Sequence, residues 1–167
     1  MRRSVCLFEG SPLGKIEVFG PDAASLPDLM CVGTLSSLPL GVARYGLRLS
    51  AHGIVIDDDI VARLGPEHFW VNTTSGGAER MALAFEEWLQ CEYVTHGVFV
   101  RPVLSQCGNV SVARPRAWAL LQAAGFDASL TPVAMMRMTM HELPCAGTTL
   151  RMMRASLSGE RATASRR

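Results

Sequence analysis

Three aspartates in a row, residues 57–59, interrupt an otherwise apolar segment, GIVIDDDIVARLG at residues 53–65. The rest of the segment is typical of a buried β-strand, whose side chains alternate between two faces. An unbroken strand gives two sets, Ile54, Ile56, Asp58 and Ile60 on one face and Val55, Asp57, Asp59 and Val61 on the other. Asp58 is then a single carboxylate among isoleucines. Because an unpaired buried charge is strongly unfavourable, we predict that Asp58 is protonated, partnered or functional.

The composition predicts one globular domain and argues against several kinds of partner. The 167 residues are enough for a compact core, and the net charge of +1 offers no electrostatic reason to bind nucleic acid or an acidic membrane. No segment has the length of a membrane span or the pattern of a signal peptide. The five cysteines are odd in number and have no CxxC spacing, which indicates reduced thiols in a cytoplasmic protein.

No metal or nucleotide motif is present. The four histidines have neither metal-ligand spacing nor a cysteine partner, so we predict no metal site. The sequence also lacks a P-loop, a GxGxxG turn and a GxSxG nucleophile motif.

The order of apolar patterns predicts an α+β protein with mostly antiparallel sheets and packed helices. Period-two patterns predict strands at 14–20, 43–50, 53–64, 68–74, 97–104 and 109–113, and a hairpin formed by 136–143 and 148–157. Helical patterns cover 21–30, 75–93 and 115–125, although Pro27 interrupts the first. The small, polar and basic residues 161–167 are expected to form a disordered tail.

Several segments, in order along the chain, resemble the aminomethyltransferase fold family, to which the glycine cleavage T-protein belongs. They are LGKIEVFGPDAA, ARYGL, the aspartate strand, FEEWLQCE, RPVLSQCGNVSVARPRA and MRASLSGE. In detail they are most similar to the folate-binding, C-terminal part of the heterotetrameric sarcosine oxidase alpha subunit. The resemblance implies that residues 1–160 form the N-terminal portion of the aminomethyltransferase folate-binding fold. The family continues beyond Glu160, whereas this chain ends in RATASRR, so we expect a fragment.

The resemblance also implies a function. Such domains bind tetrahydrofolate and capture an iminium or formaldehyde unit, here from sarcosine, as methylenetetrahydrofolate. The implied activity is that of a sarcosine-oxidase-type enzyme, with other sarcosine oxidase subunits or domains as partners and flavin bound only outside this chain. Two alternatives stay open: a glycine cleavage aminomethyltransferase, and a truncated folate-binding or assembly module without turnover.

Four site residues follow from matching the family motifs. Asp58 matches the catalytic acid in the second position of the paired-aspartate strand, where it would take up a proton. Tyr45 and Thr74 match folate-pocket positions, and Glu160 matches the glutamate that recognises the pterin ring. Each also has a structural interpretation: a charged edge strand for Asp58, a cross-strand contact for Tyr45 and an exposed turn acid for Glu160. Asp59 replaces a residue that is usually apolar in the family.

Overall fold

The computed structural model describes residues 4–113, 115–126, 131, 134–145, 147–155 and 163–166, the last four as backbone only. The chain divides into two compact units, each formed around its own sheet. Unit 1 comprises Met1–Ser11 and Cys107–Arg167, and unit 2 comprises Pro12–Gln106. No helix in the described part is long and apolar enough to cross a membrane.

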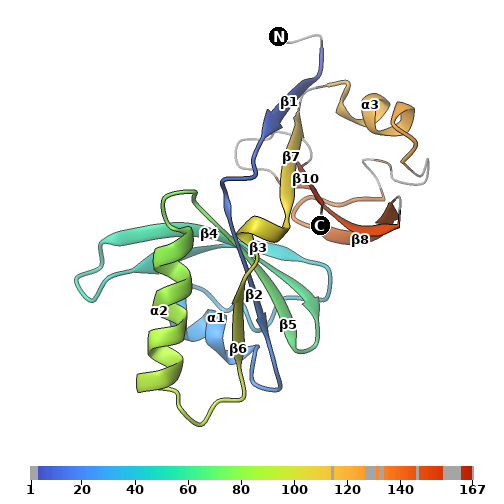
Figure 1. Ribbon diagram of the computed structural model, residues 1–167. Helices are drawn as coiled ribbons and strands as arrows, with labels where there is room; N and C mark the ends of the chain where they lie inside the picture. Colours follow the sequence, from blue (N-terminus) through green and yellow to red (C-terminus); the bar gives the residue numbers. More distant parts are fainter. Residues whose placement is uncertain are drawn as a thin grey trace. The chain divides into compact units, whose positions relative to one another are not determined.

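Unit 2 is a five-stranded sheet with two helices on one face (Figure 1). Its strand order is β3-β4-β5-β2-β6, and every neighbouring pair is antiparallel. The elements are β2 (Gly14–Phe19), α1 (Ser25–Met30), β3 (Ala43–Leu49), β4 (Val55–Gly65), β5 (His68–Thr73), α2 (Ala78–Cys91), β6 (Phe99–Pro102) and a 3-10 turn (Leu104–Gln106).

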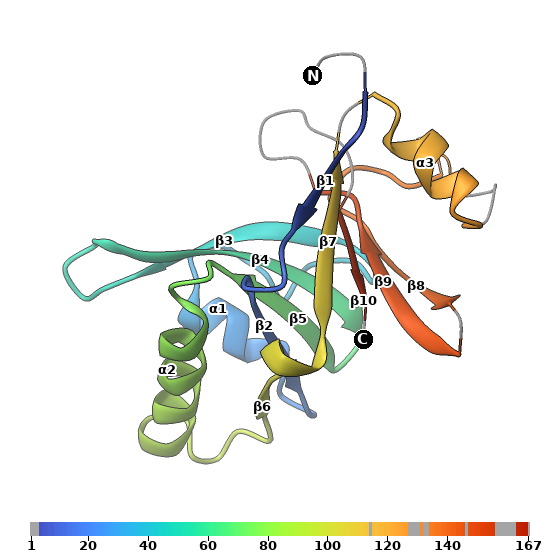
Figure 2. The same cartoon turned by 45° about the horizontal axis from the view of Figure 1, so that its top comes forward.

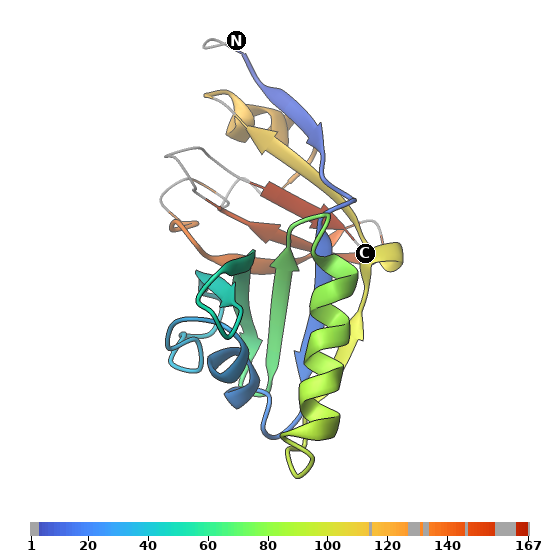
Figure 3. The same cartoon turned by 90° about the vertical axis from the view of Figure 1, so that its left-hand side faces the viewer.

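The core of unit 2 lies between its sheet and helices α1 and α2. Figure 3 shows α2 running alongside the strands. Ile16, Val71 and Val61 come from three different strands and pack with Leu26 of α1 and Phe85 of α2. The core residues lie at alternate positions of each strand, so the residues between them form a second face of the sheet.

Unit 1 contains the second five-stranded antiparallel sheet, in the order β1-β7-β10-β9-β8 (Figure 2). Its elements are β1 (Cys6–Glu9), β7 (Gly108–Ala113), α3 (Ala117–Ala123), β8 (Met140–Cys145), β9 (Thr148–Met153) and β10 (Thr163–Arg166). Trp118 and Leu121 of α3 pack on Val112, Leu150 and Met152 of the sheet.

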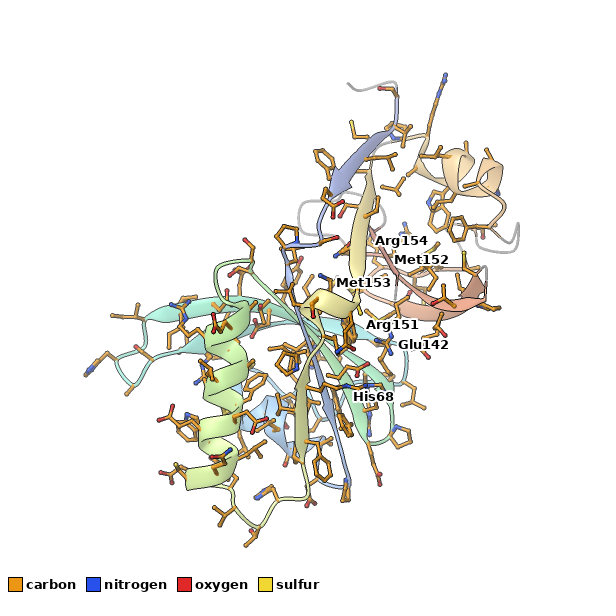
Figure 4. The ribbon with its side chains drawn as sticks, viewed as in Figure 1. His68, Glu142, Arg151, Met152, Met153 and Arg154 are labelled. Carbon is orange, nitrogen blue, oxygen red and sulfur yellow. The ribbon has the colours of Figure 1, made fainter. Side chains whose placement is uncertain are left out.

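An ion pair joins two neighbouring strands of this sheet. Arg151 Nε donates to Glu142 Oε1 at 2.7 Å, and the two residues are direct cross-strand partners on β9 and β8 (Figure 4). The Arg151 side chain is 6% exposed and the Glu142 side chain 48% exposed. The buried Arg151 guanidinium therefore has a charged hydrogen-bond acceptor, Glu142, on the edge strand β8.

The predicted α+β class with antiparallel sheets is confirmed, and the helices and strands expected within the described residues are found. Two features differ from expectation. Strand β1 was not expected, because only its pairing with β7 makes it a strand. Thr163–Arg166, expected in a disordered tail, form β10 between β7 and β9, because that position offers backbone partners on both sides.

Candidate functional site

The three aspartates of β4 point to opposite faces of the sheet. Asp57 and Asp59 are 4% and 0% exposed, whereas Asp58 between them is exposed. The prediction that Asp58 is the buried acid of this strand is therefore wrong. The helices cover the face of the sheet that carries Val61. Asp57 and Asp59 lie on that same face, and the helices therefore bury them together with Val61. Ile54, on which the prediction depended, lies before the strand and is 67% exposed.

Tyr45 lies on the same face as Asp58, on the neighbouring strand β3. The register pairs Tyr45 with Ile60 and Leu47 with Asp58, which places the tyrosine and the aspartate on one side of the sheet. The Tyr45 hydroxyl is buried and has no hydrogen-bond partner within the described residues. Burial, and after it the negative charge of Asp58, raises the pKa of Tyr45. The structure thus brings together two of the expected site residues.

Thr74 follows the end of β5 and is joined to the aspartate strand through Asp57. Thr74 Oγ1 donates to Asp57 Oδ1 at 2.6 Å, and the Asp58 backbone N–H donates to the same oxygen at 3.1 Å. The second oxygen, Asp57 Oδ2, has no hydrogen-bond partner in the described chain and lies against Gly77, which precedes helix α2. A carboxylate is favourable there because the N-terminus of a helix carries partial positive charge.

The close approach at Gly77 gives a testable prediction. A Cβ at this position would lie 1.7 Å from Asp57 Oδ2, so alanine must displace either the carboxylate or the start of α2. We expect Gly77→Ala to lower the free energy of unfolding by about 1–3 kcal/mol, as measured by urea denaturation. Gly76→Ala is the matched control, because no atom lies within 4 Å of its Cβ position. Equal stability of the two variants would contradict the close approach.

Asp59 belongs to a buried polar cluster that the sequence did not reveal. Cys31 follows α1, and its thiol donates to Asp59 Oδ2 at 3.5 Å. Gly46, opposite Asp59 on β3, leaves room for this thiol, since a Cβ there would lie 3.3 Å from the Cys31 Cβ. Burial, followed by the charge of Asp57, raises the pKa of Asp59 to about 7, while the nearby Arg48 lowers it by a smaller amount.

Burial is also the largest cause of the shift at Cys31, whose pKa is raised to about 12. Because the thiolate is the reactive form, Cys31 is an inert thiol at neutral pH. Asp59 is fully buried and its hydrogen-bonding partner is this thiol, so the cluster lies apart from the face that carries Tyr45 and Asp58.

The remaining expected residue, Glu160, lies outside the described residues. Among those described, no three His, Cys, Asp or Glu side chains gather closely enough to hold a metal ion. The candidate site is therefore Tyr45 and Asp58 on one face of the unit 2 sheet, with Thr74 connected to Asp58 through Asp57.

Comparison with known proteins decides the family. The family model described as "GCVT N-terminal domain" matches residues 1–162. The chain belongs to this family. The sarcosine oxidase subunit alpha of Corynebacterium sp. (strain U-96) is 33% identical to this GCVT N-terminal domain over 161 residues, which are 96% of the chain and 17% of the subunit. An aminomethyltransferase of Thermotoga sp. (strain RQ2) is 28% identical over 122 residues, which are 73% of the chain and 32% of that enzyme.

Solved structures agree on the fold. The crystal structure of glycine cleavage system aminomethyltransferase T from Bartonella henselae matches 99% of the chain and 42% of its own length, with a TM-score of 0.83 and 21% identity. Heterotetrameric sarcosine oxidase from Corynebacterium sp. U-96, in complex with pyrrole 2-carboxylate, contains a chain with a similar fold. The match covers 99% of the present chain and 77% of the sarcosine oxidase chain, with a TM-score of 0.67 and 19% identity. The GCVT N-terminal domain spans between 12% and 17% of the sarcosine oxidase alpha subunits that it resembles.

Proposed function

We propose that this GCVT N-terminal domain is the tetrahydrofolate-binding, one-carbon-transfer part of a sarcosine-oxidase-like enzyme. It would help to capture the iminium or formaldehyde unit from sarcosine as methylenetetrahydrofolate. The observation that carries the proposal is the 33% identity to a sarcosine oxidase alpha subunit over 96% of the chain. We further propose that other sarcosine oxidase subunits or domains are its partners, that flavin is bound there and not by this chain, and that the protein is cytoplasmic, since its five cysteines are free thiols.

The face with Tyr45 and Asp58 suits a folate. Folate combines a flat aromatic ring with several N–H donors, and it therefore needs an apolar surface with a few placed acceptors. The buried Tyr45 hydroxyl has an unused hydrogen bond, and the exposed Asp58 carboxylate is an acceptor beside it. A buried hydroxyl without a partner is unfavourable in the free protein, so a ligand group that bonds to it recovers that free energy.

Asp58 is the residue that we propose as the proton acceptor. When bound, tetrahydrofolate supplies the nitrogen nucleophile that attacks the one-carbon unit. The Asp58 carboxylate then takes up the proton released on attack, at one of its oxygens. This role no longer depends on burial. The exposed Asp58 carboxylate is accessible to a ligand, whereas Asp59, at 0% exposed on the helix-covered face, is not.

The unused hydroxyl of Tyr45 gives a prediction with opposite effects on stability and on binding. We expect Tyr45→Phe to leave the free energy of unfolding unchanged or slightly raised, because the hydroxyl has no partner to lose in the described chain. Tetrahydrofolate affinity should fall by about tenfold, the effect of losing one hydrogen bond of about 1.4 kcal/mol. Denaturation and isothermal titration calorimetry measure the two quantities. Unchanged affinity would remove Tyr45 from the pocket.

Calorimetry of the whole chain with tetrahydrofolate is the first test of the proposal. Absence of binding would contradict the folate assignment. Binding should be followed by an assay in which partner subunits of a sarcosine oxidase and sarcosine are added and methylenetetrahydrofolate is measured. Folate binding without product in that assay would favour the module without turnover.

A second candidate is a glycine cleavage aminomethyltransferase, favoured by the 28% identity to the Thermotoga aminomethyltransferase. That activity takes its one-carbon unit from an aminomethyl group on a lipoyl carrier protein. Supplying the aminomethyl-lipoyl carrier in place of sarcosine and the partner subunits separates the two enzymatic functions.

A further inference from the structure

We infer that Asp57 is a positioning residue, which fixes Asp58 and Thr74 relative to each other without touching the ligand. The inference rests on the proposed function, because it assigns a role within the same site. The three consecutive aspartates then have three roles. Asp58 faces the ligand, Asp57 positions Asp58 and Thr74, and Asp59 is held in the buried cluster.

The first support is that one oxygen joins both site residues. Asp57 Oδ1 accepts the Thr74 hydroxyl at 2.6 Å and the Asp58 backbone N–H at 3.1 Å. Thr74 follows β5, and Asp58 lies on β4, so the carboxylate connects two strands at the site. A carboxylate oxygen has two lone pairs and can accept both bonds at once.

The second support is that Asp57 itself cannot face the ligand. Its side chain is 4% exposed and lies on the helix-covered side of the sheet, opposite to that of Asp58. Its other oxygen is against Gly77, at the start of α2. Arg80, in the first turn of α2, donates to the Ile56 carbonyl at 2.8 Å and fastens the helix to β4 beside Asp57. The carboxylate is thus confined on both sides, which suits a group that orients others.

The test measures tetrahydrofolate affinity of the whole chain by calorimetry, at a temperature where every variant is folded. Asp57→Ala leaves the Thr74 hydroxyl and the Asp58 N–H without their acceptor, and we expect the affinity to fall by about 10- to 100-fold. Asp57→Asn keeps an acceptor oxygen and should stay within about threefold of the wild type. Thr74→Val should weaken binding and Thr74→Ser should restore it. The double variant Asp57→Ala/Thr74→Val should bind tetrahydrofolate only slightly more weakly than the single variant of lower affinity, because both substitutions remove the same bond.

A matched control separates positioning from general stability. Asp28 is a half-buried carboxylate of α1 that accepts the backbone N–H groups of Leu35 and Ser36 and the Ser36 hydroxyl. Asp28→Ala removes comparable hydrogen bonds elsewhere in unit 2. It should lower the melting temperature without changing folate affinity. If Asp57→Ala does not fold, Thr74→Val against Thr74→Ser tests the same bond.

Wild-type affinity in Asp57→Ala and in Thr74→Val would overturn the inference, as would failure of Asp57→Asn to restore binding. If the wild-type chain itself does not bind folate, the proposed function fails separately. The inference is then decided by NMR of the Asp58 amide, which should shift upfield in Asp57→Ala relative to Asp57→Asn, a variant that changes the same neighbour and keeps the acceptor oxygen. An Asp58 amide unmoved by Asp57→Ala would show that the bond is not made.

Discussion

Replacing Asp58 with alanine is expected to slow methylenetetrahydrofolate formation by about 100- to 10,000-fold, the usual contribution of a general base. Folate binding should be partly retained, because Tyr45 and the rest of the proposed site are untouched. The measurement is product formation with sarcosine and the partner subunits present. Full activity in Asp58→Ala would remove this residue from the mechanism.

The same substitution should have almost no structural cost. The Asp58 side chain is exposed, and its backbone N–H bond to Asp57 is kept in alanine. We therefore expect the free energy of unfolding to change by less than about 0.5 kcal/mol. The pKa of Tyr45 should move down, since the charge of Asp58 contributes to raising it, and absorbance titration detects this change. Glu67→Ala, which removes an exposed acid from the turn between β4 and β5, is the control and should leave product formation unchanged.

Asp59 is expected to make the stability of the protein fall as pH rises towards neutrality. Its folded-state pKa of about 7 lies above the ordinary value of 3.8, chiefly because the carboxyl is buried and next because Asp57 is near. The folded protein therefore holds this proton more tightly than the unfolded chain does. The stabilising effect is complete below the unfolded pKa and is lost as pH rises through the folded pKa. The slope approaches about 1.4 kcal/mol per pH unit within that window.

The comparison with Asp59→Asn isolates this effect from other titrating groups. Asparagine has the same shape and no charge to bury, so this contribution to the pH dependence disappears in the variant. Urea denaturation of both proteins between pH 5 and pH 8 should show the wild type losing about 2–3 kcal/mol relative to the variant. Parallel pH profiles would contradict the assigned burial. In Cys31→Ala the free energy of unfolding should begin to fall at a higher pH, because the thiol hydrogen bond that this variant removes lowers the pKa of Asp59.

The three aspartates show which part of the candidate site could be predicted. The sequence indicated a strand with acids on both of its faces, and the family motif selected Asp58 with Tyr45, which the structure places on one face. The sequence did not indicate which face is covered, because isoleucines and valines occupy both parities of the segment. The burial of Asp57 and Asp59 results from α1 and α2, whose packing on one side depends on the whole of unit 2.

The fold shows the same division between local and distant causes. Local patterns of apolar residues, prolines and glycines were enough to predict the strands β2 to β9 and the helices within the described residues, since period and turn chemistry are encoded over a few neighbours. Strands β1 and β10 were missed, because short segments with weak patterns become strands only when distant partners offer hydrogen bonds. The sequence alone therefore determined the α+β class and the family motifs. Only the tertiary structure decided which aspartate faces outward, because exposure depends on what packs against a strand and alternation specifies only which residues share a face.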